Sequence, residues 1–376
     1  MRIKLLVLAL SAFAGQGAAT AQVNQSLDVQ VIEAPKIVRI GATDQLVYEL
    51  HLTNFSSHPV ELNGLVIEAG NRHTPLKTYS RDELPQAMDL VGPPEANARI
   101  IPTGRRAVVY VGAPVPAAFP REPISHRLTL SKIDTDEADF TISGGAATLE
   151  TAALPRLSPP LRGGPWVAVY DPAMERGHRR VFYATEGSAT LPGRFAIDFM
   201  KVDASGKLSA GDADIPANHH GFGAAVLAVA DGTIVAVRDD VPDPATAKGR
   251  TNPAIADASG NYVMLDIGGG RIATYEHLKQ GAPVEVGDRV KAGHVIGFLG
   301  FTGQASAPHL HFHLADRASI LGAEGQPYVF ASLTRLGRYE TIDSFFRGET
   351  WPPADRSETV RDSFPPPNLV VRFPGD

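Results

Sequence analysis

Short segments in which apolar and polar residues alternate, separated by glycine- and proline-containing turns, recur along this chain. In residues 46–53 the apolar side chains Leu46, Tyr48, Leu50 and Leu52 occupy every second position, which is the pattern of a half-buried strand. Similar candidate strands occur at 60–69, 106–111 and 124–133. The 36 glycines and 30 prolines supply many turns, and residues 26–150 contain no helix of convincing length. The chain is therefore expected to be mainly β.

The order of these segments predicts two β domains. Residues 22–150 are expected to form an Ig-like β-sandwich, in which His126 shares the parity of apolar neighbours and is predicted to be a hydrogen-bonded core residue. Residues 151–162 are predicted to be a Pro-rich linker. Residues 163–345 are predicted to form a compact antiparallel β-sheet domain with tight glycine turns. Residues 346–376 are predicted to be a Pro-rich tail, extended on the surface or partly disordered.

The N-terminal segment, residues 1–21, has the features of a signal peptide. Arg2 and Lys4 precede the apolar run Leu5–Ala14, and small residues at 19–21 form a cleavage site. The apolar run is too short to span a bilayer, and no later stretch approaches that length. The mature chain is therefore expected to be exported to the periplasm or the cell exterior, without a transmembrane helix.

Charge and cysteine content limit the classes of function. The chain has 35 basic and 41 acidic residues, and loss of the predicted signal removes two bases, which leaves a net charge of −8. This balance argues against nucleic acid as a partner. The chain has no cysteine, so an exported fold must be stable without disulfides. For the same reason, any zinc site must use histidine and carboxylate ligands.

Two histidines, His309 and His311, alternate with apolar residues in the segment Pro308–Leu314. Alternate residues of a strand point to one face, so the two imidazoles would project side by side from a rigid support. Such a pair can place one histidine on a metal and the other beside it for acid/base work. Three further segments precede this motif in the chain: Phe195–Phe199, Tyr275–Leu278 and Val284–Gly303.

Together these segments, within residues 160–320, resemble the lysostaphin/LytM-type zinc endopeptidases, which cut peptide cross-links of bacterial cell walls. The resemblance implies an exported zinc metalloendopeptidase with a duplicated-hybrid-motif-like β domain. It also implies one Zn²⁺ per chain and peptidoglycan peptide as the substrate. By their positions in the family motifs, Asp198 and His311 are implied as zinc ligands, and His277 and His309 as the catalytic acid/base pair.

The remaining zinc ligand departs from the family pattern. Arg194 stands four residues before Asp198, where the family's His-x-x-x-Asp motif has its histidine. A guanidinium stays protonated and has no lone pair for a metal. Either another histidine completes the site or the site has lost its metal. His178 is the preferred substitute, and His219 or His220 is the second choice.

His178 can reach Asp198 if the chain between them folds back on itself. Turn-prone residues separate two strand-like segments, 180–184 and 194–199, which are expected to pair as a hairpin. Arg194 would then be a cation outside the metal site, facing substrate or supporting a ligand, or a salt-bridge partner of an acidic loop.

A second interpretation keeps the fold but not the chemistry. The chain would then be a non-catalytic LytM-like module that binds wall peptide or regulates a partner hydrolase. Arg194 favours this alternative, whereas retention of the His-x-His pair, Asp198 and His277 favours the enzyme. A peptidase for protein substrates is a third, weaker option. His313 shares the parity of the His-x-His pair. It is left open whether His313 lines the groove, orients a neighbouring side chain by a hydrogen bond, or is a partly exposed residue without a role. No partner is predicted for the N-terminal domain.

Overall fold

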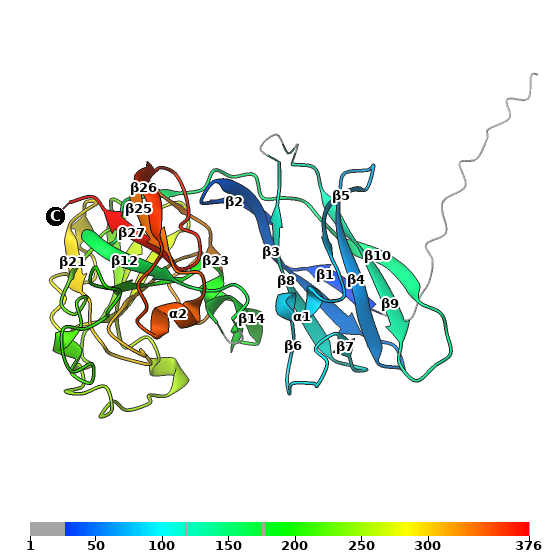
Figure 1. The fold of residues 1–376 in the computed structure, drawn as a ribbon, viewed down its shortest axis with the longest axis horizontal. Helices are drawn as coiled ribbons and strands as arrows, with labels where there is room; N and C mark the ends of the chain where they lie inside the picture. The colour runs from blue at the N-terminus through cyan, green and yellow to red at the C-terminus, as the bar shows by residue number, and fades with distance from the viewer. Residues whose placement is uncertain (1–26, 117–118, 120, 175–176, 376) are drawn as a thin grey trace, which may run out of the picture.

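The computed structural model describes residues 27–116, 119, 121–174 and 177–375, so the predicted signal peptide lies outside the described residues. An N-terminal sandwich and a C-terminal domain built on one large sheet lie side by side along the longest axis (Figure 1). The prediction of a mainly β chain is confirmed. Within the described ranges, no helix is long and apolar enough to cross a membrane.

The N-terminal domain consists of two antiparallel sheets of five strands, which share one apolar core. The first sheet contains β1 (Leu27–Val31), β3 (Thr43–Asn54), β8 (Arg106–Pro114) and β6 (Met88–Leu90), with β2 (Lys36–Ile40) on β3. The second contains β10 (Phe140–Ala147), β9 (Ile124–Lys132), β4 (Val60–Ala69) and β5 (Thr74–Tyr79), with β7 (Ile100–Ile101) on β4. The short helix α1 (Leu84–Ala87) precedes β6. This is a β-sandwich, and its Ig-like character stays a prediction.

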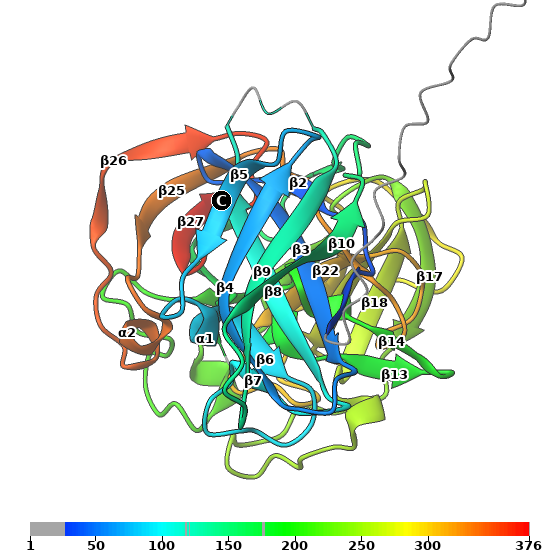
Figure 2. The ribbon, with the colours of Figure 1, turned by 90° about the vertical axis from the view of Figure 1, so that its right-hand side faces the viewer.

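The alternating residues of β3 behave only partly as predicted. Leu46 and Leu50 are fully buried in the sandwich core, as a half-buried strand requires. The intervening side chains Glu49 and His51 are also buried, with 3% and 7% exposure. The outer face of this sheet is covered by the C-terminal domain, where Phe182 stacks edge-on against His51 with ring centroids 5.7 Å apart. Figure 2, viewed from the side of the sandwich, shows the sandwich in front of the large sheet.

His126 lies in the sandwich core, as the strand parity predicts. It is fully buried, and its Nε2 accepts a hydrogen bond from the Tyr48 hydroxyl at 2.7 Å. Its Nδ1 donates to the Gly144 carbonyl at 3.3 Å. Both ring nitrogens therefore have partners that suit a neutral imidazole.

We expect the sandwich to lose stability as the pH falls from 7 to 4. Burial lowers the pKa of His126 from 6.5 to about 4, so the unfolded chain takes up a proton that the folded chain resists. The contribution of neutral His126 is complete above pH 6.5 and falls by about 3 kcal/mol on reaching pH 4. Urea unfolding at both pH values measures the loss, and His126→Gln should remove that part of it. An unchanged pH dependence in this variant would contradict the assignment.

The C-terminal domain is built on a sheet of eleven strands. Their order is β20 (Arg289–Val290), β17 (Gly232–Arg238), β18 (Asn261–Asp266), β19 (Ile272–Leu278), β22 (Leu310–Ala315), β15 (Ile197–Lys201), β12 (Gly163–Val169), β27 (Leu369–Phe373), β25 (Leu333–Arg338) and β26 (Pro353–Val360), with β23 (Gly325–Gln326) on β22. All of its pairs are antiparallel. Asp198, His277 and His311 therefore lie on three adjacent strands, β15, β19 and β22.

Smaller elements surround this sheet. Three strand pairs are β11 (Arg156–Leu157) with β24 (Val329–Phe330), β13 (Tyr183–Thr185) with β14 (Ser188–Thr190), and β16 (Ala225–Leu227) with β21 (Val295–Phe298). The 3₁₀ turns are η1 (His178–Arg180), η2 (Pro192–Phe195), η3 (Pro216–Asn218) and η4 (Ile255–Asp257), and the second helix is α2 (Ile342–Phe346). The first strand pair is parallel and anchors the segment predicted to be a linker.

The C-terminal residues correct one prediction. Residues 346–376 were expected to be a surface tail, but β27 inserts between β12 and β25 in the large sheet. Leu369 and Val370, which point to opposite faces of this strand, are buried at 3% and 0% exposure, so both faces are covered. The prolines that suggested a tail lie before this strand, which is itself apolar. The domain limits predicted from the sequence otherwise remain our proposal.

Candidate metal and catalytic site

The large sheet brings the predicted site residues together on one face. On β22, the apolar side chains Leu310 and Phe312 are fully buried in the core, so the alternating histidines point to the opposite face. His311 is paired in register with Asp198 of β15 on one side and with Glu276 of β19 on the other. Strand pairing therefore fixes Asp198, Glu276 and His311 relative to one another.

His178, Asp198 and His311 form a compact group of potential metal ligands. His178 Nε2 lies 3.0 Å from Asp198 Oδ2, and His311 Nδ1 lies 2.9 Å from Asp198 Oδ1. The two imidazole rings meet edge to face, with centroids 4.7 Å apart. One ligand atom from each residue falls within 4.8 Å of the others. Two imidazoles and one carboxylate are a donor set that zinc favours, so the residues present fit this metal.

The charges in this group favour an ionised carboxylate. Burial alone would raise the pKa of Asp198, but His178 and His309 facing it hold the pKa well below its usual range. Burial opposes protonation of His178, yet Asp198 raises the pKa of that imidazole above its ordinary value. An anionic aspartate is the form that a cation requires.

The local structure that places His178 beside Asp198 differs from the expected hairpin. Segments 180–184 and 194–199 do not pair with each other. The hairpin is formed by β13, which includes the end of the first segment, and β14. Instead, His178 begins η1, which packs against η2. A Cβ on Gly193 would lie 2.5 Å from the His178 carbonyl oxygen, so glycine permits this close approach. The two turns, rather than a long hairpin, bring His178 opposite Asp198.

Arg194 lies outside the metal group. Its guanidinium contacts Glu49 Oε2 at 2.7 Å and Glu324 Oε2 at 2.8 Å. The second-choice histidines are also placed elsewhere. His219 Nε2 is hydrogen-bonded to the Ala213 carbonyl at 3.0 Å, and His220 Nε2 lies 3.9 Å from an Asp203 oxygen. Of the three histidines considered for the vacant motif position, the structure places His178 beside Asp198.

His277 and His309 lie next to the metal group as a pair, with ring centroids 4.6 Å apart. Nδ1 of His277 donates to the Thr302 carbonyl at 2.9 Å, and Nδ1 of His309 donates to the Ala307 carbonyl at 2.8 Å. With Nδ1 bound to a carbonyl in each ring, Nε2 is the nitrogen that can accept a proton in the neutral form. His309 Nε2 lies 3.4 Å from Asp198 Oδ1. Burial, together with the neighbouring His309 and His311, lowers the pKa of His277 well below its usual value.

Glu276, which the sequence-based interpretation left out, and His313, whose role it left open, lie behind His311. His311 Nε2 lies 3.2 Å from His313 Nδ1. Glu276 Oε1 lies 3.6 Å from His313 Nδ1 and 3.9 Å from His311 Nε2. These three residues form a second group that could hold a metal. In the sequence, His313 could be linked to the site by its strand parity with His311. Glu276 could have been linked to it by its position directly before His277.

A groove of about 190 Å³ opens onto these residues. It is lined by His178, Glu276, His277, His311 and His313, and by apolar side chains that include Val181, Ile320 and Leu321. An apolar wall beside convergent polar groups is typical of a site that binds an extended organic substrate.

Comparisons with known proteins match part of the C-terminal domain. The model of "Peptidase family M23" matches residues 213–322. Glycyl-glycine endopeptidase ALE-1 of Staphylococcus capitis is 33% identical over 134 residues, which is 34% of this chain and 33% of that protein. Peptidoglycan DD-endopeptidase ShyC of Vibrio cholerae is 44% identical over 54 residues, which is 14% of this chain and 12% of that protein. The matched regions therefore span a third or less of these curated relatives.

Solved structures give matches of lower identity. The catalytic domain of lysostaphin from Staphylococcus simulans is 23% identical, with a TM-score of 0.25, over 44% of this chain and 88% of that chain. A zinc-containing peptidase from Vibrio cholerae is 13% identical, with a TM-score of 0.25, over 77% of this chain and 82% of that chain. From the sequence matches, we conclude that the chain contains a peptidase family M23 domain, homologous to the lysostaphin/LytM-type glycyl-glycine endopeptidases.

Proposed function

We propose that this chain is an exported, zinc-dependent endopeptidase that hydrolyses peptide cross-links of bacterial peptidoglycan. One observation carries the proposal: a paired His277 and His309 lie directly beside the group His178, Asp198 and His311, on one face of a rigid sheet. Homology to M23 endopeptidases supports the reaction class. The name of one relative, peptidoglycan DD-endopeptidase ShyC, supports the choice of substrate.

In this proposal the chain's residues divide into ligands and proton carriers. His178 Nε2, Asp198 and His311 Nδ1 would hold the zinc. Bound zinc would supply Lewis-acid chemistry, activating a water and polarising the scissile carbonyl. Nε2 of His277 and of His309, both unprotonated in the neutral tautomers, would accept the proton of the attacking water and return it to the departing amine. His313 and Glu276 would orient His311 through its other ring nitrogen.

The rival interpretation, a non-catalytic module that binds wall peptide, loses its main support. It rested on Arg194 in place of a histidine, but Arg194 has a partner in Glu49, and His178 occupies the position beside Asp198. A module that has lost its chemistry has no physical need for four buried or half-buried site histidines around one aspartate. The enzyme is therefore the function that this arrangement supports better.

Digestion of purified peptidoglycan tests the proposal. Full-length mature protein should release cross-link fragments, seen as new primary amines and as altered muropeptides in liquid chromatography. A chelator should abolish release, and added zinc should restore it, because the ligand set needs the metal. Sedimentation with peptidoglycan without any release, in zinc-loaded protein, would support the binding module instead. Fractionation of cells that produce the full chain tests its export.

A further inference from the structure

A buried carboxylate of the sandwich reaches into the C-terminal domain. Glu49, on β3, has 3% exposure. Its two oxygens contact two different arginines of the other domain: Oε2 lies 2.7 Å from Arg194 Nε, and Oε1 lies 3.3 Å from Arg179 Nε. Burial would raise the pKa of Glu49, but Arg194 and Arg179 outweigh that effect and keep it lowered. Glu49 is therefore an anion shared by two cations at the domain interface.

Further bonds fix both arginines. Arg179 Nη2 donates to the carbonyls of Tyr48 at 3.0 Å and Val111 at 2.6 Å, both in the sandwich. Arg194 Nη1 donates to the Gly325 carbonyl at 3.1 Å and contacts Glu324 at 2.8 Å. Two guanidiniums therefore face two carboxylates, which balances the buried charge. A buried network of this kind holds its members in one geometry.

The two arginines lie in the turns η1 and η2, close in the chain to the proposed metal ligands His178 and Asp198. Arg179 follows His178 in η1, and Arg194 lies in η2, four residues before Asp198. A 3₁₀ turn of three or four residues has little stability of its own. Glu49 contacts one turn through each carboxylate oxygen, so it ties η1 to η2 from the sandwich side.

We infer that Glu49 is a positioning residue that holds His178 against Asp198, so that the N-terminal sandwich completes the metal site of the C-terminal domain. This inference rests on the proposed function, since it takes His178 as a ligand. It also explains the departure from the family motif. Arg194 contacts the sandwich instead of the metal. The ligand is His178, which lies in the turn η1 that the sandwich holds in place.

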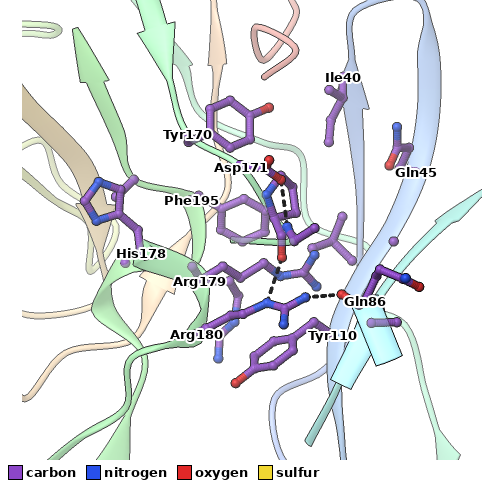
Figure 3. Close-up of a pocket in the computed structure, with 18 of the residues that line it drawn as sticks. Ile40, Gln45, Gln86, Tyr110, Tyr170, Asp171, His178, Arg179, Arg180 and Phe195 are labelled. Atoms are coloured by element: carbon purple, nitrogen blue, oxygen red, sulfur yellow. Dashed lines mark hydrogen bonds between the residues drawn. The ribbon is translucent and has the colours of Figure 1, made fainter. Parts of the chain in front are cut away.

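Neighbouring contacts support the same role for the sandwich. Arg180 Nη1 lies 3.0 Å from Asp89 Oδ1, and Nη2 of the same side chain donates to the Gln86 carbonyl. The Arg180 guanidinium also stacks 4.9 Å from the centre of the Tyr110 ring. Figure 3 shows Arg179 and Arg180 reaching from the His178 segment towards the sandwich beside an interface cavity of about 390 Å³. His178 itself lines both this cavity and the active-site groove.

The test compares two buried glutamates of the sandwich in the full chain. Glu49→Gln removes the charge at the interface but keeps the size and one carbonyl acceptor. Glu61→Gln is the matched control, because Glu61 has 8% exposure and contacts Arg99 at 2.7 Å and Arg81 at 3.1 Å, all within the sandwich. Zinc affinity is measured by competition with a chromophoric chelator. Glu49→Gln should weaken it by about 10-fold, as loss of a supporting partner does, and Glu61→Gln should leave it unchanged.

Hydrogen exchange of the metal-free proteins provides a second readout. The Arg180 amide, which donates to the Gly177 carbonyl at 2.7 Å, should exchange faster in Glu49→Gln than in Glu61→Gln. If Glu49→Gln does not fold, Arg179→Lys should show the same weaker zinc affinity and faster exchange. This variant keeps the positive charge but loses the forked donor geometry of the guanidinium. Equal zinc affinity and equal exchange in the Glu49 and Glu61 variants would overturn the inference. Wild-type protein that binds no zinc would overturn it together with the proposed function, whereas zinc binding without cleavage would refute only the proposed function.

Discussion

His309→Ala and His277→Ala are each expected to lower the turnover of peptidoglycan cross-links by about 10²–10⁴-fold, the usual scale for a positioned acid/base group. Both variants should keep their zinc. The reason is geometric: in each ring Nδ1 is bound to a backbone carbonyl, and only Nε2 is free to move a proton. Turnover is measured from the release of primary amines, with zinc content determined on the same samples.

Two outcomes of this experiment would contradict the assignment. If either variant loses its zinc, ligand and acid/base roles have been exchanged. His309→Ala tests this most closely, because His309 Nε2 lies 3.4 Å from Asp198 Oδ1. If both variants keep their zinc and their full turnover, the pair does not carry the proton. His294→Ala is a suitable control, because His294 is an exposed residue of the same domain.

His178→Ala and His311→Ala are each expected to weaken zinc binding by more than about 100-fold, beyond the range for loss of an outer-shell partner. Two remaining ligands seldom hold zinc at working concentrations, because the binding free energy is spread over the whole set. Elemental analysis after gel filtration measures bound zinc, and circular dichroism checks the fold. The same exposed-histidine control should keep its metal.

The variants also decide between the two groups that share His311. If His178→Ala keeps its zinc and His313→Ala loses it, the metal lies with Glu276 and His313 instead. We expect the reverse, because both His178 and His311 lie within 3.0 Å of the Asp198 carboxylate. His313→Ala should weaken zinc binding by only about 10-fold to 100-fold, the effect of losing a supporting partner.

Much of this site could be predicted from the sequence, because several of its residues lie on or next to paired strands, where side chains alternate with a period of two. The His-x-His spacing placed His309 and His311 on one face, and short motifs marked His277 and Asp198. His178 was harder to place, since it depends on the packing of two 3₁₀ turns rather than on a strand pattern. The choice of His178 followed from the chemistry of arginine, which cannot bind a metal.

Other features depend on contacts between distant parts of the chain. Glu49 has the position of an outward-facing residue on an alternating strand, and nothing in its neighbours reveals that another domain covers it. The burial of β27 shows the same limit: flanking prolines suggested a tail, while the apolar run Leu369–Phe373 was needed in the sheet. Periodicity reports the face of a strand, but it does not report which surface packs against it.

Zinc content of the wild-type chain tests the central claim most directly. Full-length mature protein, purified without chelator or added metal and then passed through gel filtration, should contain one zinc per chain by elemental analysis. Absorption spectroscopy at the zinc edge should find two imidazole nitrogens and carboxylate oxygen at about 2.0–2.2 Å. Protein that is folded yet holds no stoichiometric metal, even after incubation with zinc, would contradict both the metal site and the proposed enzyme.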